Sequence, residues 1–336
     1  MIVPLFSKEP IMPSIRFVQL DVFTSNAFQG NPLAVFPEGD HLTDEQMGKI
    51  AREMNLSETV FVQTPTDPKT RRNPANSNVP APEVLRRLRI FTPMREIPFA
   101  GHPIVGTWNA LAREGLVAPP EGGNGWTRIY HEVEIGILPV DLEFRNSQPS
   151  QVVMTQGDFK VLAEVKDQNE RAEIARAVGL RPEDLDDALP IQGITTGLSC
   201  LAVPIKSINR LQQCRIDATR LADIYQGLGT TGCLAFSRET LESGSSVHAR
   251  FFAPADNIPE DPATGSACGA LGGYLIHHNA LKLTPEEGRY KFVIEQGDFI
   301  NRPSRINLTV KGTAGKVEEV KVGGPSVVVA KGEVFL

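Results

Sequence analysis

The chain has 336 residues, of which 41% are hydrophobic and 22% are charged, and its formal net charge at pH 7 is −6. A chain of this length exceeds one hydrophobic core of ordinary size, so we expect two domains. The acidic balance argues against a nucleic-acid partner, because phosphate binding requires clustered lysine and arginine side chains.

The N-terminus and the cysteines predict a cytoplasmic protein. Residues 1–10 hold an apolar run that is too short for a signal peptide and that proline interrupts. No segment reaches the about 18 consecutive apolar residues of a membrane span, so we expect no membrane partner. The cysteines show no C-x-x-C spacing, which fits reduced, partly buried thiols. They are Cys200, Cys214, Cys233 and Cys268.

The first elements in chain order are strands and one surface helix. Residues 17–23 and 33–36 predict a strand pair around a Gly30-Asn31-Pro32 turn. Residues 43–46 have the pattern of a capping box, which predicts an amphipathic helix to about Met54. The next expected strand covers residues 59–63.

Residues 66–88 predict a solvated surface insertion. The stretch is rich in proline and polar residues and overlaps the only dense basic run of the chain. That run consists of Lys69, Arg71, Arg72, Arg86, Arg87 and Arg89. A lid, a partner surface and a plain loop remain open as roles for this insertion.

The most informative feature is an internal repeat. Residues 89–107 and 250–266 each read as a strand ending in Phe-x-Pro, a turn, and then [His/Asp]-Pro-x-x-Gly-[Thr/Ser] opening a helix. The two helices, expected at 104–116 and 263–280, are apolar or small nearly all round, so each should be buried on all sides. We therefore expect an α+β fold of two pseudo-symmetric lobes, each a curled, mostly antiparallel sheet around one central helix. A second similarity between the two halves is the segment Gln-Gly-Asp-Phe, which begins at residue 156 and again at residue 296.

The remaining segments complete this division into lobes. A hairpin is expected at 133–144, the start of the second lobe at 151–155, helices at 170–178 and 218–225, and closing strands at 316–336. The first lobe should span residues 1–149, joined by the C-terminal strand at about 325–336, and the second lobe should span residues 150–324.

The starts of the two central helices are the expected site. Each presents free backbone N–H groups and a positive dipole end, and a pseudo-two-fold axis would make the two starts face each other across one cleft. Such a cleft suits an anion, most simply a substrate carboxylate. His102 and Asp261 occupy matched positions of the repeat, and Thr107 and Ser266 add hydroxyl groups one turn further in.

Glu58 is the candidate base. It stands between the end of a helix and an apolar strand, where a side chain can be directed into a cleft. An exposed glutamate has a pKa near 4.3 and is a weak base, but partial burial raises that pKa.

Several motifs in the same order resemble one known family over nearly the whole chain. They read Asp21-Val-Phe-Thr…Gly30-Asn-Pro-Leu-Ala34-Val-Phe, Asn55-Leu-Ser-Glu58-Thr-Val-Phe, Phe99-Ala-Gly-His102-Pro…Gly106-Thr, Asp261-Pro-Ala-Thr-Gly-Ser266-Ala and Glu295-Gln-Gly297…Arg302-Pro-Ser304. The chain resembles the phenazine-biosynthesis isomerase-like (PhzF-like) family, whose fold is that of diaminopimelate epimerase. It departs from the family pattern in the insertion at 66–88 and in Asn301, where glycine is common.

The resemblance implies an isomerase that needs no cofactor or metal and that forms a homodimer. It implies that Glu58 is the acid/base that moves a proton on a dihydro-hydroxyanthranilate, and that His102, Asp261 and Ser266 line the site. With the helix starts, this makes Glu58, His102 and Asp261 the expected catalytic residues. The expected substrate-binding residues are Gly101, Thr107, Gly265 and Ser266.

Other interpretations stay open at this point. Glu58 could be a solvated carboxylate at a helix end, His102 could satisfy a loop, and Asp261 could serve only as a helix cap. A thiol-based racemase would need a cysteine at each helix start, and Cys268 lies further inside its helix. A binding or scaffolding protein of the same fold is the third hypothesis. Dinucleotide, P-loop and nucleophile-elbow motifs are absent from the sequence.

Overall fold

A computed structural model describes residues 13–66 and 83–336, and within these ranges the strands form one continuous hydrogen-bonded sheet. The strands are β1 Ser14–Val22, β2 Asn31–Phe36, β3 Glu58–Gln63, β4 Val84–Phe91, β5 Glu96–Ile97, β6 Gly125–Val133, β7 Gly136–Arg145, β8 Gln148–Thr155, β9 Lys160–Val165, β10 Ile191–Thr195, β11 Ser199–Pro204, β12 Cys233–Ser237, β13 Val247–Ala253, β14 Ile258–Asp261, β15 Arg289–Gln296, β16 Ser304–Thr313, β17 Lys316–Gly324 and β18 Ser326–Phe335. The α-helices are α1 Asp44–Met54, α2 Gly101–Arg113, α3 Gln168–Ala177, α4 Ile208–Gln213, α5 Ala218–Gly227 and α6 Gly265–His277.

The strands are paired according to one plan that occurs twice. In the first half, β1 and β2 are antiparallel, β2 and β3 parallel, β3 and β4 antiparallel, β4 and β6 parallel, and β6, β7 and β8 antiparallel. In the second half, β10, β11, β12, β13, β15, β16 and β17 follow the same sequence of pairings. Helix α2 connects β4 to β6, and α6 connects β13 to β15. The expected α+β fold with an internal repeat is therefore confirmed.

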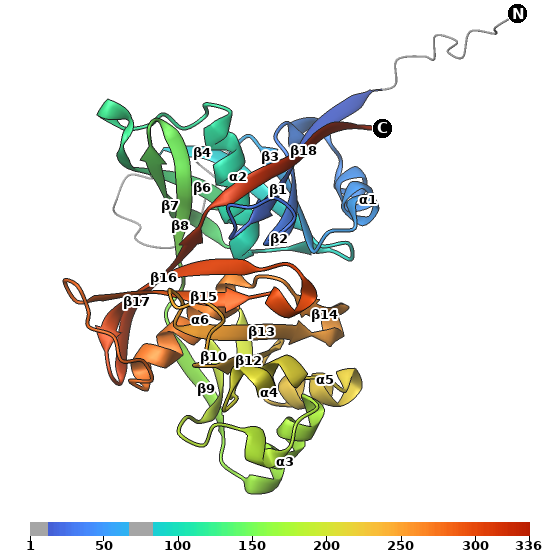
Figure 1. Cartoon of the computed structure of the whole chain (residues 1–336). Helices are drawn as coiled ribbons and strands as arrows, with labels where there is room; N and C mark the ends of the chain where they lie inside the picture. The colour runs from blue at the N-terminus through green and yellow to red at the C-terminus, as the bar shows by residue number, and fades with distance from the viewer. Residues whose placement is uncertain (1–12, 67–82) are drawn as a thin grey trace, which may run out of the picture.

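Each half also receives an edge strand from the other half. Strand β9 follows β8 but pairs with β10, and β18 follows β17 but pairs with β1. Figure 1 shows β18 leaving the lower part of the molecule to lie beside β1 in the upper part. Strands β8 and β17 pair with each other in antiparallel fashion, which makes the sheet continuous between the two halves. Strand β8 pairs with β7 as well, so the strand expected to open the second lobe also completes the first sheet.

Both central helices are enclosed by their sheets. All residues of α2 up to Ala112 and all residues of α6 up to Ile276 are buried. A Cβ on Gly106 would stand 2.6 Å from Cδ2 of Leu33, and a Cβ on Gly273 would stand 2.4 Å from Cδ2 of Phe159. Glycine at these two positions therefore lets the surrounding side chains pack directly on the helix backbone.

Three local expectations were wrong. Strand β4 begins at Val84, so residues 84–88 belong to the sheet rather than to a solvated insertion, because alternate side chains of that strand face the core. The rest of the expected insertion, residues 67–82, lies outside the described residues. The hairpin consists of β6 and β7 with its turn after Val133, so the expected range 133–144 holds the turn and only the second arm of it. The two Gln-Gly-Asp-Phe segments follow β8 and end β15, which are not matched strands.

Arg89 of β4 is engaged within the chain. Arg89 donates through Nε and Nη2 to both carboxylate oxygens of Glu96, at 2.8 and 2.5 Å, and through Nη1 to Asp44 at 2.5 Å. A guanidinium paired in this way is not free to bind phosphate. Arg250 and Glu260 form the corresponding bidentate pair on β13 and β14, at 2.9 and 2.6 Å.

Candidate active site

The starts of α2 and α6 lie against each other. A Cβ on Gly101 would stand 3.2 Å from the backbone nitrogen of Ser266, so only glycine at 101 allows this approach without displacement. Neither helix has a side-chain cap, and neither carries an acidic residue in its first turn. The N–H groups and positive dipole ends of both helices are therefore not compensated by their own first turns. Gly265 leaves room for the Phe23 ring, which would stand 2.9 Å from a Cβ there.

Glu58 and His102 meet beside these helix starts. Glu58 is the first residue of β3, and the left-handed Asn55 (φ 50°) ends α1 and turns the chain toward that strand. Its Oε2 lies 3.4 Å from Nε2 of His102, the second residue of α2, and the two side chains are 14% and 6% exposed. Neither of these two atoms has a hydrogen-bond partner among the residues that the structure describes. Both groups thus keep capacity for a ligand.

Burial dominates the electrostatics of the site. It raises the pKa of Glu58 to about 8, with the negative charge of Asp261 acting in the same direction and the Ser57 hydroxyl opposing. Burial lowers the pKa of His102 to about 3, so this imidazole is neutral at pH 7. Burial also raises the pKa of Asp261 to about 6, against hydrogen bonds from Thr264 and Asn31.

Asp261 reaches the site from the end of β14. Its Oδ2 accepts a hydrogen bond from the Thr264 hydroxyl at 2.5 Å, and its Oδ1 accepts one from Nδ2 of Asn31 at 3.0 Å. The buried amide of Gln296 donates to the Asp261 carbonyl at 2.8 Å and accepts from the Thr264 backbone N–H at 3.1 Å. The segment that leads into α6 is therefore fixed from two sides.

Two site residues were missed by the sequence reasoning. Asn31 was assigned only to a turn, yet it is fully buried and contacts Asp261 and His102. Gln296 was noted only as part of the repeated Gln-Gly-Asp-Phe segment and of the motif that begins at Glu295. In the structure it holds the segment before α6. Both belong to motifs that carried the family resemblance, which is the signal that could have identified them.

The remaining candidates divide between the helix start and the helix interior. Ser266 is the second residue of α6 and lies beside Gly101. Thr107 is the seventh residue of α2, and its Oγ1 is buried without a hydrogen-bond partner among the described residues. The expectation that both hydroxyls lie one turn in does not hold, because α2 begins at Gly101 whereas the matched segment of the second half stays non-helical until Gly265.

Asn301, the other departure from the family pattern, has a local explanation. It adopts a left-handed conformation with φ 58°, which glycine reaches freely and which asparagine tolerates better than most residues. The backbone of this turn is thus compatible with either residue.

Comparison with known proteins identifies the family. The family model described as phenazine biosynthesis-like protein matches residues 20–332. The chain belongs to this family. It is 33% identical over 318 residues to an uncharacterized isomerase from Clostridium acetobutylicum, covering 95% of this chain and 97% of that protein. It is 32% identical over 321 residues to trans-2,3-dihydro-3-hydroxyanthranilate isomerase from Pseudomonas aeruginosa, covering 96% and 99%. The resemblance is confirmed, and the chain is an isomerase.

Solved structures agree with this assignment. The crystal structure of a PhzF-family phenazine biosynthesis protein from Bacillus anthracis is 26% identical with a TM-score of 0.79 and covers 97% of this chain and 100% of that one. A hydroxyproline epimerase from Agrobacterium vitis has a TM-score of 0.60 at 13% identity, covering 96% and 93%, which extends the likeness of fold alone.

The described residues contain neither a membrane-spanning helix nor a grouped set of metal ligands. No helix within 13–66 and 83–336 is long and apolar enough to cross a membrane. In the same ranges, no three His, Cys, Asp or Glu side chains are grouped so that they could hold a metal ion.

Proposed function

We propose that this isomerase moves a proton on a small carboxylate-bearing substrate, with Glu58 as the general acid/base. The observation that carries the proposal is the position of the Glu58 carboxyl group. It is buried 3.4 Å from Nε2 of His102, beside two uncapped helix starts that lie in contact. A buried carboxyl group with a pKa near 8 is a much stronger base than an exposed one and can return the proton readily.

The helix starts suit the substrate carboxylate. Backbone N–H groups of Gly101, Gly265 and Ser266 and two positive dipole ends would attract the anion and hold it in one orientation. Glu58 would then remove a proton from a neighbouring carbon, and the electron pair would delocalise toward the carboxylate. The same dipoles stabilise the negative charge that develops there, so the step as proposed needs no cofactor. Glu58 returns the proton to a different carbon, which moves the double bond.

His102 and Asp261 take positioning and polar roles in this scheme. His102 is neutral at pH 7, so it faces the Glu58 carboxyl group across 3.4 Å as a polar group and not as a full charge. Asp261 and Ser266 lie at the start of α6, where they can orient the substrate. Thr107 stays a predicted binding residue.

The curated relative from Pseudomonas aeruginosa suggests the first substrate to test, trans-2,3-dihydro-3-hydroxyanthranilate. Its conversion by the wild-type protein would be followed by absorbance and by deuterium incorporation in D2O. Glu58→Gln should reduce kcat by about 10³-fold or more, within the range that general acid/base catalysis and positioning supply together, while calorimetry still detects substrate binding. Glu53→Gln, at an exposed position of α1, is the matched control. A fully active Glu58→Gln enzyme would remove the proposed mechanism.

The thiol-based racemase is less well supported. Cys268 is the fourth residue of α6, is fully buried, and donates its thiol hydrogen to Oε1 of Gln296 at 3.3 Å. Burial raises its pKa well above the ordinary value, which disfavours the thiolate that such chemistry requires. A homodimer and a cytoplasmic location stay predictions.

A further inference from the structure

Asn31 connects the residues of the site through one amide. Its Nδ2 lies 3.0 Å from Oδ1 of Asp261, 2.9 Å from the carbonyl oxygen of Ala263 and 3.4 Å from Nδ1 of His102. Its Oδ1 accepts a hydrogen bond from the Ser57 hydroxyl at 3.1 Å. Because a backbone carbonyl can only accept, the NH₂ group must face Ala263, and the orientation of the amide follows.

This orientation determines which nitrogen of His102 carries the proton. The two hydrogens of this NH₂ group go to the nearer acceptors, Ala263 and Asp261, and its nitrogen accepts no hydrogen bond. A hydrogen on Nδ1 would therefore face a group with no acceptor at 3.4 Å, so the hydrogen of the neutral ring is assigned to Nε2. Nε2 is the nitrogen that faces Oε2 of Glu58 at 3.4 Å. We propose that Asn31 is a positioning residue that fixes the Nε2–H tautomer of His102 and so places an N–H group 3.4 Å from Oε2 of Glu58. A catalytic effect of this positioning by Asn31 rests on the proposed function of Glu58.

The position of Asn31 is itself set by contacts from the second half of the chain. Arg302 donates through Nε to the carbonyl of Gly30 and through Nη2 to that of Gln29, both at 2.9 Å, and it pairs with Oδ1 of Asp21 at 2.6 Å. The N–H of Gly30 donates to the Pro303 carbonyl at 3.0 Å. These bonds hold the two residues before Asn31, so its amide enters the site in one orientation.

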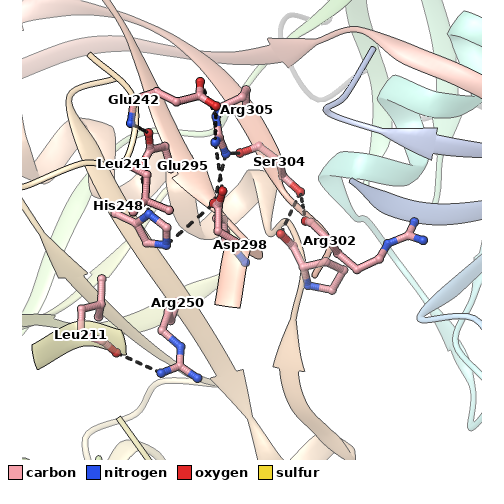
Figure 2. Close-up of polar contacts among 12 residues, drawn as sticks. Leu211, Leu241, Glu242, His248, Arg250, Glu295, Asp298, Arg302, Ser304 and Arg305 are labelled. Carbon is pink, nitrogen blue, oxygen red and sulfur yellow. Dashed lines mark hydrogen bonds and ion pairs between the residues drawn. The ribbon is translucent and has the colours of Figure 1, made fainter. Parts of the chain in front are cut away.

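The turn that carries Arg302 also contacts the segment before α6. Figure 2 shows the Arg302 side chain pointing away from the other labelled residues toward the ribbon of the first half, and Ser304 on the next strand. The Ser304 hydroxyl donates to the Pro262 carbonyl at 3.0 Å. Asn31 and the Asp261 segment are thus held by one turn, which supports a positioning role rather than a chance contact.

The strand before this turn is also well anchored. Glu295 accepts hydrogen bonds from the backbone N–H groups of Leu241 and Glu242 at 2.8 and 2.7 Å and contacts Nδ1 of His248 at 2.8 Å, as drawn in Figure 2. The end of β15, from which the chain continues into the turn at Arg302, is therefore held by contacts within the second half.

The first test is the tautomer of His102 in the wild-type protein. Long-range ¹H–¹⁵N NMR distinguishes Nε2–H from Nδ1–H, and the spectrum of a His102→Gln variant identifies the signal among the six histidines. We expect Nε2–H. An Nδ1–H signal would overturn the inference, and this measurement requires neither turnover nor an Asn31 variant. It would stand even if no isomerase activity were found, which separates this inference from the proposed function.

The second test changes the amide. Asn31→Asp places a carboxylate at Nδ1 and should move the proton to that nitrogen, whereas Asn31→Ala should leave a mixture of tautomers. We expect kcat to fall roughly 10- to 100-fold with little change in KM, as for other residues that orient a functional side chain. Asn307→Ala is the control, because Asn307 also donates an amide hydrogen bond between the halves, to Gln151 at 3.0 Å, without contacting the site. Folded Asn31→Ala enzyme with wild-type kcat and tautomer would refute the proposal.

Discussion

Glu58→Gln should stabilise the folded protein while it abolishes turnover. Burial raises the pKa of Glu58 from 4.5 to about 8, so the folded chain binds this proton more tightly than the unfolded chain. A group of this kind lowers the free energy of unfolding as pH rises from 4.5 to 8, because ionisation is easier in the unfolded state. Glutamine has nearly the same shape and does not ionise. The free energy of unfolding of the variant therefore lacks this decrease between pH 4.5 and 8.

The size of this change in the free energy of unfolding follows from the interval between the two pKa values, 4.5 and about 8. At about 1.36 kcal/mol per pH unit, ionisation of Glu58 removes roughly 3 kcal/mol by pH 7 and roughly 5 kcal/mol above pH 8. Unfolding entropies of about 2.1 cal/mol/K per residue give roughly 0.7 kcal/mol/K for this chain. The Tm of the variant should therefore exceed that of the wild type by about 4 °C at pH 7 and by almost nothing at pH 4.5.

The assay is thermal and urea unfolding of both proteins at several pH values between 4.5 and 8.5. Titrating groups far from Glu58 affect both proteins equally and cancel in the difference. Glu53→Gln, at an exposed position of α1, is the control for a glutamate-to-glutamine change outside the site. A difference in stability that is the same at pH 5 and pH 8 would refute the reasoning, since it would mean that Glu58 ionises as easily in the folded state as in water.

Three further predictions concern activity. The kcat/KM of the wild type should rise with pH through an apparent pKa near 8, and Asp261→Asn should move this rise to lower pH, because the Asp261 charge raises the pKa of Glu58; an unmoved profile would contradict the coupling. Gly101→Ala should lower kcat/KM roughly 10-fold, because its Cβ would stand 3.2 Å from the nitrogen of Ser266 and push the helix starts apart. Gly48→Ala, which meets nothing closer than 3.9 Å on α1, should leave kcat/KM unchanged, and equal losses in both would remove the argument. Iodoacetamide should not inhibit the enzyme, because all four cysteines are buried, and rapid inactivation would favour thiol chemistry.

The parts of the fold that could be predicted from the sequence are those that local patterns determine. The capping box of Thr43 and Gln46 is present with both of its hydrogen bonds. The two enclosed helices were predictable because an all-apolar helix has no face for water. Their first residues were not, because α2 and α6 begin without side-chain caps, which are the usual start signal.

The non-local features were harder to predict. The exchange of β9 and β18 between the halves depends on pairings across the whole chain, and no short pattern encodes it. Val84 was assigned to a loop because the proline-rich composition of the preceding residues outweighed the strand pattern that follows. Asn31 looked like a turn residue because its burial depends on contacts that are distant in the sequence, such as those with Asp261 and Ala263, more than 200 positions away in the chain.

The repeat has one consequence for stereochemistry. Phe91 and Phe252 are matched in the repeat, Thr59 pairs with Phe91, and Cys233 pairs with Phe252. The residue matched to Glu58 is therefore Gly232, whose missing side chain leaves room for the Phe251 ring. The second half thus contributes no carboxyl group at the position where the first half contributes Glu58, the proposed base. Racemisation by two bases needs a proton acceptor on each face of the substrate, whereas a single base returns the proton to the face from which it came. A pseudo-symmetric scaffold with one glutamate at these matched positions is accordingly suited to moving a proton between two carbons on one face of the substrate, as the proposed shift of a double bond requires.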